Sequence, residues 1–360
     1  MTFREAAARG SMLRFRNFST LAALLFAASC ATFSGKSEPH TANEGFSFPV
    51  IGDIPYSEDD AELLQTAIIP AIRDGAYPFV IHVGDYKGGG SPCDAAADDA
   101  QLALIEALKP APVFYTPGDN EWTDCDRFKD PATGNPMSEL ARLQRVRDQY
   151  FVTPVDAPKA MQVTAQAAMT ENVTWTYRSV RFANLHIVAT NNGRNEVAGD
   201  DTADAATAAD QRDISNLAWL LEVVAIAKRE QARALVISFQ ADLTDVNNSL
   251  LKTPCVGATV SRQRDCDAFA ILRPAIRDAA AAFGGPTLLI HGDTAPFTFG
   301  QSFAGDEAPN LWRLNAAGDF GHSGAVTYGV QDATLVTIDP DATTPFSATG
   351  LVTDAAPNAE

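Results

Sequence analysis

The chain has 360 residues and a hydrophobic content of 46%, which is enough to bury the core of one large globular domain. Its formal net charge is −18, so its field repels the phosphates of nucleic acids and anionic membrane surfaces, and neither is an expected partner. A small anionic ligand would need a local cation to bind this chain.

The first 31 residues have the pattern of an export signal. Arg14 and Arg16 precede a short apolar run at 21–31, LAALLFAASCA, which ends in small residues and is too short to span a bilayer. We therefore expect residues 1–31 to direct export to the periplasm or out of the cell, and residues 32–45 to form a linker.

Two processing outcomes stay open at the end of this signal. Cleavage near Ala31 would release a soluble protein, whereas lipid modification of Cys30 would anchor the protein to a membrane. Ala27 stands where lipoprotein signals usually carry leucine, which favours the soluble form. A lipid on Cys30 is the one membrane attachment that the sequence leaves open.

Apolar, β-branched runs alternate with helical patterns over residues 46–340, which predicts an α/β domain. The predicted strands lie at 46–53, 77–85, 111–119, 174–190 (a hairpin turned at Arg181), 234–242 and 286–293. The predicted helices begin near Ser57, Ser91 and Ser138 and cover about 209–230 and 267–283. The Ala/Asp/Thr-rich patch 197–210 is predicted to be a mobile surface loop, and 341–360 a C-terminal tail with one edge strand at Phe346–Val352.

Four cysteines remain once Cys30 is set aside, an even number in a chain that its signal sends to an oxidising compartment. Cys255 and Cys266 bracket one short polar loop, and Cys93 and Cys125 each follow a Gly-Asp segment. We therefore predict the disulfides Cys93–Cys125 and Cys255–Cys266. A zinc site is less favoured, because the chain has no C-x-x-C spacing.

Four predicted strands end with the same dipeptide, in VIGD, HVGD, TPGD and IHGD, which places Asp53, Asp85, Asp119 and Asp293 at strand ends. The carboxyl ends of parallel strands share one edge of a sheet, where ligands usually bind. Two carboxylates about 4 Å apart repel by about 4 kcal/mol at a surface-like dielectric, so such a cluster must take protons or bind a cation. Gly-Asp is also a common turn pair, and it recurs at 199–200, 305–306 and 318–319.

The order of these segments resembles that of the calcineurin-like metallophosphoesterases. That family has the motifs Gly-Asp-x-His, Gly-Asp-x-x, Gly-Asn-His-Glu/Asp, a lone His after a strand, and Gly-His-x-His. The corresponding stretches here are GDIPY, GDYKGG, GDNEW, SFQAD and HGDTAPF, so the chain is similar to a divergent, histidine-poor member. The resemblance covers residues 46–340 and implies a four-layer αββα sandwich of two mixed sheets flanked by helices.

The resemblance also implies a set of metal ligands. Asp53 and Asp85 match the family's metal-binding aspartates, and Asp85 holds the position that bridges two ions. Asp119 stands where the family has a ligand Asn, Gln240 where it has the lone His, and Asp293 where it has the first His of the last motif. Oxygen donors thus replace imidazoles, which favours Mg²⁺, Mn²⁺ or Ca²⁺ over Zn²⁺ or iron.

Other positions of the motifs have lost their histidines. Pro55 and Ala295 offer nothing to a metal, so the site is expected to hold one ion or two. The predicted catalytic residues are Asn120, which replaces the family's substrate-binding His, and His291, which is placed to hydrogen-bond a ligand. An amide cannot act as a general acid, so Asn120 would only bind the phosphate.

Three polar residues of Gly/Asn-rich loops, Lys87, Asn192 and Arg194, are predicted to bind a small phosphorylated substrate, although each also suits a solvated loop or turn. The sequence thus favours an exported, monomeric, metal-dependent phosphoesterase that hydrolyses a phosphate mono- or diester with metal-activated water. The alternative is a catalytically degenerate protein of the same fold that serves as a binding module. Hydrolysis of a different ester also stays open, without support from a G-x-S-x-G motif.

Overall fold

The computed structural model describes residues 45–195, 197–244, 253–323 and 326–360. The predicted export signal and Cys30 lie outside the described residues, as does the linker except for Gly45. Among the helices that are described, none is long and apolar enough to cross a membrane.

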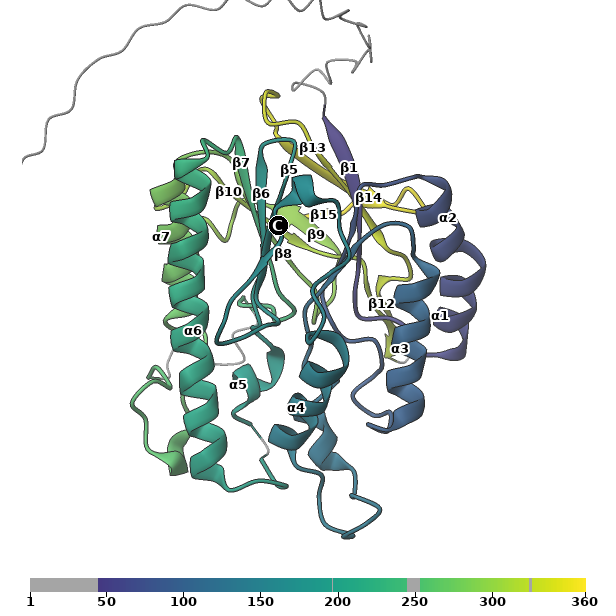
Figure 1. The fold of residues 1–360 in the computed structure, drawn as a ribbon, viewed down its shortest axis with the longest axis vertical. Helices are drawn as coiled ribbons and strands as arrows, with labels where there is room; N and C mark the ends of the chain where they lie inside the picture. Colours follow the sequence, from purple (N-terminus) through teal and green to yellow (C-terminus); the bar gives the residue numbers. More distant parts are fainter. Residues whose placement is uncertain (1–44, 196, 245–252, 324–325) are drawn as a thin grey trace, which may run out of the picture. The chain divides into compact units, whose positions relative to one another are not determined.

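The first of two large sheets has five strands in the order β14-β13-β1-β2-β3 (Figure 1). β1, β2 and β3 run parallel, so their carboxyl ends share one edge, while β13 and β14 are added antiparallel. The strands span Phe46–Ile51 (β1), Val80–His82 (β2), Val113–Tyr115 (β3), Thr334–Ile338 (β13) and Phe346–Gly350 (β14).

The second sheet has eight strands in the order β15-β9-β10-β8-β7-β6-β5-β4, and β6, β7, β8 and β10 run parallel. They span Thr164–Ala165 (β4), Val173–Tyr177 (β5), Val180–Asn184 (β6), Ala234–Ser238 (β7), Thr287–His291 (β8), Thr298–Gly300 (β9), Leu311–Asn315 (β10) and Asn358–Ala359 (β15). A separate hairpin joins β11 (Gly318–Ser323) to β12 (Val326–Val330).

Helices flank both sheets (Figure 1). Those beside the first sheet are α1 (Glu58–Leu63), a π-helical turn (Leu64–Ile68), α2 (Ile69–Asp74) and α3 (Ala95–Ala107). Those beside the second are α6 (Thr202–Arg229) and α7 (Leu272–Phe283). The remaining helical segments are α4 (Glu139–Tyr150), α5 (Ala189–Gly193) and the 3₁₀ turns Thr123–Arg127, Lys159–Met161 and Val260–Arg262. The order helix, sheet, sheet, helix is the four-layer αββα sandwich that the resemblance implies.

Aromatic rings fill the space between the two sheets. Phe114 stacks on Trp175 with ring centroids 3.7 Å apart, and Trp175 stacks on Phe182 at 5.2 Å. Phe79 meets this stack edge-on. Because each sheet is covered by this core on one face and by helices on the other, its central strands are buried on both faces, which explains their almost continuous apolar sequences.

Local structure departs from the sequence predictions in two places. The patch 197–210, predicted as a loop, is helical from Thr202, because the Asp201 side chain accepts the backbone N–H groups of residues 203 and 204 and the following alanines favour a helix. The β5–β6 hairpin turns at Arg178–Ser179, both at positive φ, rather than at the buried Arg181 of β6.

The C-terminal residues 341–360 contribute strands to both sheets. β14 pairs with β13 at the edge of the first sheet, within the predicted edge strand Phe346–Val352. β15 pairs in parallel with β9 of the second sheet. These residues are therefore part of the sandwich instead of a free tail.

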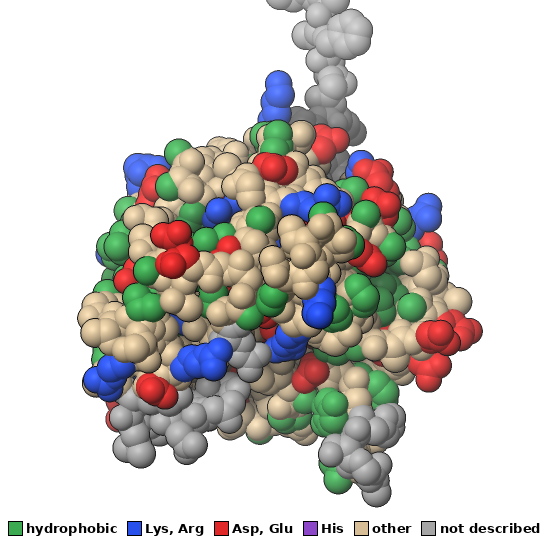
Figure 2. Space-filling view, turned by 90° about the horizontal axis from the view of Figure 1, so that it is seen from below, with side chains coloured by type: hydrophobic (Ala, Val, Ile, Leu, Met, Phe, Trp, Pro, Cys, Tyr) green, Lys and Arg blue, Asp and Glu red, His purple; other side chains and the backbone are tan. Residues whose placement is uncertain are grey.

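Both predicted disulfides are present, Cys93–Cys125 and Cys255–Cys266. The surface of the described residues carries charges of both signs. On the face seen in Figure 2, acidic and basic side chains are interspersed instead of forming one large patch of either sign.

Candidate functional site

The ends of five strands bring the predicted metal-binding residues together. Asp53, Asp85 and Asp119 follow β1, β2 and β3 of the first sheet, and Gln240 and Asp293 follow β7 and β8 of the second. The first four are buried, and Asp293 is partly buried. Because these strands are parallel within each sheet, their side chains gather at one edge of the sandwich.

Hydrogen bonds link the two sheets at this edge. The backbone N–H of Asp293 donates to Asp53 Oδ1 over 2.8 Å. Gln240 Nε2 lies 3.2 Å from Asp85 Oδ2 and 3.0 Å from Asp119 Oδ1. The predicted convergence of the strand ends is therefore what the structure shows, while the metal-binding role of these residues stays a prediction.

Three of the aspartates have a left-handed backbone, with φ of 58° at Asp53, 56° at Asp85 and 77° at Asp293. This conformation is uncommon outside glycine, and such residues cluster at functional sites. The neighbouring glycines leave the space that the turns require. A Cβ on Gly118 would stand 1.9 Å from Asp85 Oδ1, and one on Gly84, at φ +95°, would stand 2.4 Å from the Gly118 nitrogen.

Tyr56 and Asn120 cover the carboxylates. Tyr56 Oη lies 3.1 Å from Asp85 Oδ2 and 3.4 Å from Asp53 Oδ1. Asn120 Nδ2 donates to the same Asp85 oxygen over 3.0 Å and lies 3.1 Å from Tyr56 Oη. Tyr56 is a site residue that sequence reasoning missed, and its one signal was its place three residues after Asp53 in the first motif.

Three more residues join the site without having been predicted as part of it. Glu121 is fully buried beside Asp85, and its Oε1 accepts the Tyr115 hydroxyl over 3.1 Å. Thr190 donates to Asp119. Asp319 approaches Asp53, whose backbone oxygen accepts the Asp319 N–H over 3.1 Å. Asp319 belongs to one of the Gly-Asp pairs that the sequence offered only as a turn, so the same dipeptide signal could have found it.

The electrostatics of the cluster favour a neutralising partner. Burial raises the pKa of Asp53, Asp85 and Asp293 well above the usual range, and the neighbouring carboxylates add to the effect. Burial also raises the pKa of Asp119 and Glu121. The charged forms of these groups are therefore unfavourable, and either a proton or a cation would neutralise them.

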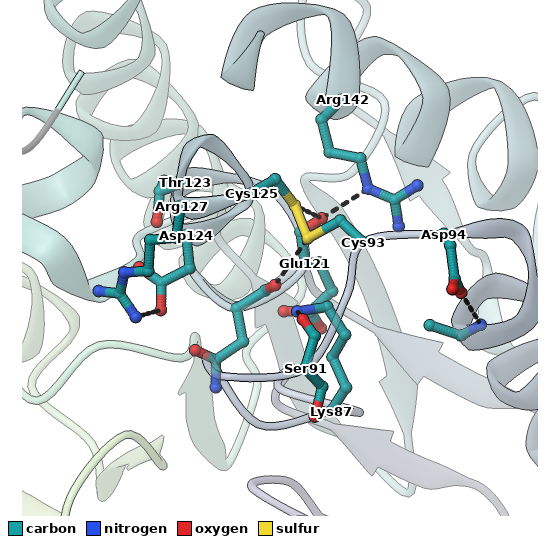
Figure 3. The surroundings of a disulfide bond; sticks show 12 residues. Lys87, Ser91, Cys93, Asp94, Glu121, Thr123, Asp124, Cys125, Arg127 and Arg142 are labelled. Carbon is teal, nitrogen blue, oxygen red and sulfur yellow. Dashed lines mark hydrogen bonds and ion pairs between the residues drawn. A yellow bond between two sulfur atoms is a disulfide. The ribbon is translucent and has the colours of Figure 1, made fainter. Parts of the chain in front are cut away.

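Lys87 lies beside the cluster but binds its own loop. Its Nζ donates to the backbone oxygen of Ser91 over 3.0 Å, and burial lowers its pKa although Glu121 and Asp85 oppose that shift. The disulfide Cys93–Cys125 joins this loop to the turn that carries Glu121 (Figure 3). Lys87 is thus held by its own loop, and its predicted substrate-binding role stays a prediction.

Asn192 and Arg194 bind the scaffold instead of pointing to the carboxylates. Asn192 Nδ2 donates to Asp213 Oδ1 over 2.6 Å. Arg194 forms ion pairs with Asp213 at 2.7 Å and Asp210 at 2.8 Å, and its side chain is fully buried. Both residues therefore tie α5 to α6, and their predicted substrate-binding role stays a prediction.

His291 is buried behind Asp293. Its Nδ1 lies 2.8 Å from the Gly292 backbone oxygen and its Nε2 3.2 Å from Arg313 Nη1. Burial lowers its pKa, although Asp242 opposes that shift, so the neutral imidazole is favoured. These contacts hold the His291 ring next to Gly292 and Arg313, and its predicted catalytic role stays a prediction.

The carboxylates fit a divalent ion by their chemistry, although not by their present placement. Among the described residues, no three His, Cys, Asp or Glu side chains are arranged to hold a metal. Gln240 accepts the Ala189 N–H with its Oε1 over 2.7 Å, so it turns nitrogen and not oxygen toward Asp85 and Asp119. The donors that remain are carboxylate oxygens with uncompensated charge, which suit a hard cation.

The comparisons with known proteins find similarity only to solved structures, and this similarity concerns the fold. No protein-family model matches the chain, and no curated protein matches it. The structure of PhoD is 12% identical with a TM-score of 0.47, covering 82% of this chain and 64% of that one. GAP50, the anchor in the inner membrane complex of Plasmodium, is 10% identical with a TM-score of 0.42, covering 88% and 91%. A hypothetical protein from Thermus thermophilus is 11% identical with a TM-score of 0.34, covering 84% and 97%. The function must therefore be argued from the site itself.

Proposed function

We propose that the protein is an exported phosphoesterase that hydrolyses a small phosphate mono- or diester with the help of a divalent ion held by the strand-end carboxylates. One observation carries the proposal: Asp53, Asp85 and Asp293, from two sheets, meet in left-handed backbone conformations. Uncompensated buried charge and an unfavourable backbone both cost free energy, which a bound cation would offset.

Some residues of the site would bind the ion, and others would bind the substrate. Asp53, Asp85, Asp119 and Asp293 would hold Mg²⁺, Mn²⁺ or Ca²⁺. The ion would supply a water of lowered pKa and charge for the phosphoryl oxygens. Asn120 would donate hydrogen bonds to the phosphate but cannot protonate a leaving group. We therefore expect aryl phosphates, which have good leaving groups, to react fastest.

Arg127 is the cation best placed to meet the substrate. Its guanidinium is 45% exposed and pairs with Asp124 at 2.7 Å. A Cβ on Gly89 would stand 2.9 Å from Arg127 Nη1, 2.6 Å from Asn120 Oδ1 and 2.3 Å from Asp124 Oδ2, so Arg127, its partner Asp124 and Asn120 face the same small space. Arg127 would give up part of its pairing with Asp124 to supply the local positive charge that an anionic ligand needs on a chain of net charge −18.

Export is proposed from the pattern of residues 1–31 together with the two disulfides. Disulfides persist in oxidising compartments, so their presence suits a periplasmic or secreted protein. A monomer without nucleic-acid partners, and a lipid on Cys30 as the alternative to release, remain predictions from the sequence.

The test is metal content of the purified protein together with hydrolysis of an aryl phosphate monoester and diester in Mg²⁺, Mn²⁺, Ca²⁺ or Zn²⁺. We expect turnover that depends on Mg²⁺ or Mn²⁺ and falls at least about 100-fold in Asp85→Asn. Asp59→Asn, an exposed carboxylate of α1, is the matched control and should keep full activity. Absence of bound metal together with absence of turnover in every ion would rule the proposal out.

A binding module is the second candidate, because the carboxyl groups already have hydrogen-bond donors from Tyr56, Asn120 and Gln240. Protonated acids satisfied in this way need no metal. This reading predicts a well-folded protein with neither metal nor turnover, which the same measurements would reveal.

A further inference from the structure

A second polar site lies at the far end of the eight-stranded sheet. β15 pairs with β9, with Asn358 opposite Thr298, and this pairing lays Glu360 against Gly300. A Cβ on Gly300 would stand 2.5 Å from the Cβ of Glu360, so only glycine leaves room for this approach. The pairing of β15 with β9 thus directs the Glu360 side chain toward the interior of the domain.

The Glu360 side chain enters a ready-made carboxylate site. Its Oε1 accepts Arg313 Nε over 2.6 Å and the Phe303 N–H over 3.2 Å. Its side chain is 8% exposed, and within the described part of the chain its buried Oε2 has no hydrogen-bond partner. Only one of the two carboxylate oxygens of Glu360 therefore accepts hydrogen bonds there.

The surrounding cavity is larger than one carboxylate needs. It has a volume of about 380 Å³, and its lining includes Arg273, Arg277, Arg313, Thr244 and Ser302. Small-molecule pockets begin at about 300 Å³. Three guanidinium groups around one space are donors that recognise carboxylates and phosphates, while the Thr244 hydroxyl donates to Asp242 and the Ser302 hydroxyl to the Glu360 backbone oxygen.

Among the described residues around this arginine pocket, the charges balance only while Glu360 is inside. Arg273 pairs with Asp267, and Arg313 Nη1 donates to Asp242 Oδ1 over 3.0 Å. Arg277 lies 4.0 Å from Glu307, whose side chain is 75% exposed, so that pair is weak. Withdrawal of Glu360 would leave a positive pocket on a strongly acidic chain.

We propose that the arginine pocket binds a small oxyanion, a carboxylate or a phosphate, and that the Glu360 side chain competes with this ligand. In the structure, the Glu360 carboxylate occupies the place that the carboxylate or phosphate ligand would take. The proposal does not depend on phosphoesterase activity, because none of the strand-end aspartates lines this cavity.

The experiment compares binding of inorganic phosphate and of acetate to metal-free wild-type protein and to Glu360→Gln by isothermal titration calorimetry. Glu360→Gln removes the negative charge that pairs with Arg313, so if Glu360 fills the pocket about nine-tenths of the time and the neutral amide no longer holds that place, oxyanion binding should strengthen about tenfold. The phosphate and acetate arms show which oxyanion is preferred. Glu307→Gln, an exposed acid at the same surface, is the matched control and should change affinity little.

A second substitution locates the binding. Arg277→Gln, whose side chain is 28% exposed, should weaken oxyanion binding at least about fivefold, alone or combined with Glu360→Gln. Circular dichroism confirms folding of each variant, and if Glu360→Gln fails to fold, Arg277→Gln alone decides the question. The proposal is wrong if Glu360→Gln folds but gains no affinity for either anion, or if Arg277→Gln binds as the wild type does.

Discussion

Single residues at the strand ends combine two costs, a left-handed backbone and a poorly solvated carboxyl group. Aspartate tolerates positive φ better than most residues, and glycine beside it lets the next turn approach closely. Asp85 shows both effects, since its φ is 56° and its Oδ1 occupies the space where a side chain on Gly118 would stand. The Gly-Asp dipeptide is thus a steric requirement of the site.

Gly118→Ala tests this requirement. The new Cβ would clash with Asp85, so we expect a loss of about 1–3 kcal/mol in the free energy of unfolding, measured by urea denaturation. Gly90→Ala is the control, because a Cβ there meets nothing within 4 Å. Equal stability of the two variants would show that the glycine is not needed for packing.

Glu139 gives the structure a pH dependence outside the candidate site. Burial, with Asp126 beside it, raises the pKa of Glu139 to about 9. Since the folded pKa lies above the unfolded value of about 4.3, stability from this group is full at low pH and is lost as pH rises from about 4.5 to 9.

Between pH 5 and pH 8, wild-type protein should therefore lose a few kcal/mol more stability than Glu139→Gln, at no more than about 1.4 kcal/mol per pH unit. Urea denaturation at both pH values measures the difference. Glu106→Gln, whose side chain is 66% exposed, should behave as the wild type. Identical pH dependence in wild type and Glu139→Gln would contradict the pKa assignment.

Among the elements, the loops around the site depend on disulfides more than on regular structure. Cys93–Cys125 joins the loop of Lys87 to the turn of Glu121, and Arg142 of α4 donates to the Glu121 backbone oxygen over 2.8 Å (Figure 3). Cys255–Cys266 closes a shorter loop elsewhere in the chain. The first bridge therefore supports the candidate site directly.

Replacing each cysteine pair by serine should separate the two bridges. Their sequence separations are 32 and 11 residues, for which loop-closure entropy gives losses of about 4 and about 3 kcal/mol respectively. Only loss of Cys93–Cys125 is expected to reduce aryl phosphate turnover as well. Thermal unfolding and activity assays compare the variants, and a greater effect on activity from loss of Cys255–Cys266 would oppose this assignment.

At the scale of the whole molecule, the site belongs to neither sheet alone. Asp53, Asp85 and Asp119 come from the first sheet, and Gln240 and Asp293 from the second, with the aromatic core holding the sheets together. Any ligand that binds all these groups would clamp the two sheets to each other. Binding should therefore stabilise the whole fold.

Addition of Mg²⁺ or Mn²⁺ at about 100 times its Kd should stabilise the fold by about 2.7 kcal/mol and raise the Tm by several degrees. A chelator should reverse the shift, and Asp85→Asn should abolish it. Differential scanning calorimetry measures both effects without any substrate. A Tm that is insensitive to every divalent ion would favour the binding-module reading.

The sequence by itself determined the α/β class, the strand-end aspartates and the disulfide pairs. These features depend on local patterns: apolar runs set strands, Gly-Asp sets turns, and chain order places parallel strand ends on one edge. The resemblance added the four-layer sandwich. Helix α6 shows that composition alone does not distinguish a loop from a helix. The alanine-rich patch at its start was expected to be a loop but forms a helix that an aspartate caps.

Only the tertiary structure decided which polar side chains meet. Tyr56 and Asp319 join the carboxylates because separate loops fold over the same edge, whereas Asn192 and Arg194 turn to α6, where each donates a hydrogen bond to Asp213. Gln240 turns its nitrogen inward because the Ala189 N–H claims its oxygen. Such choices depend on the partners that burial makes available across the chain, and these partners are not encoded in any local pattern.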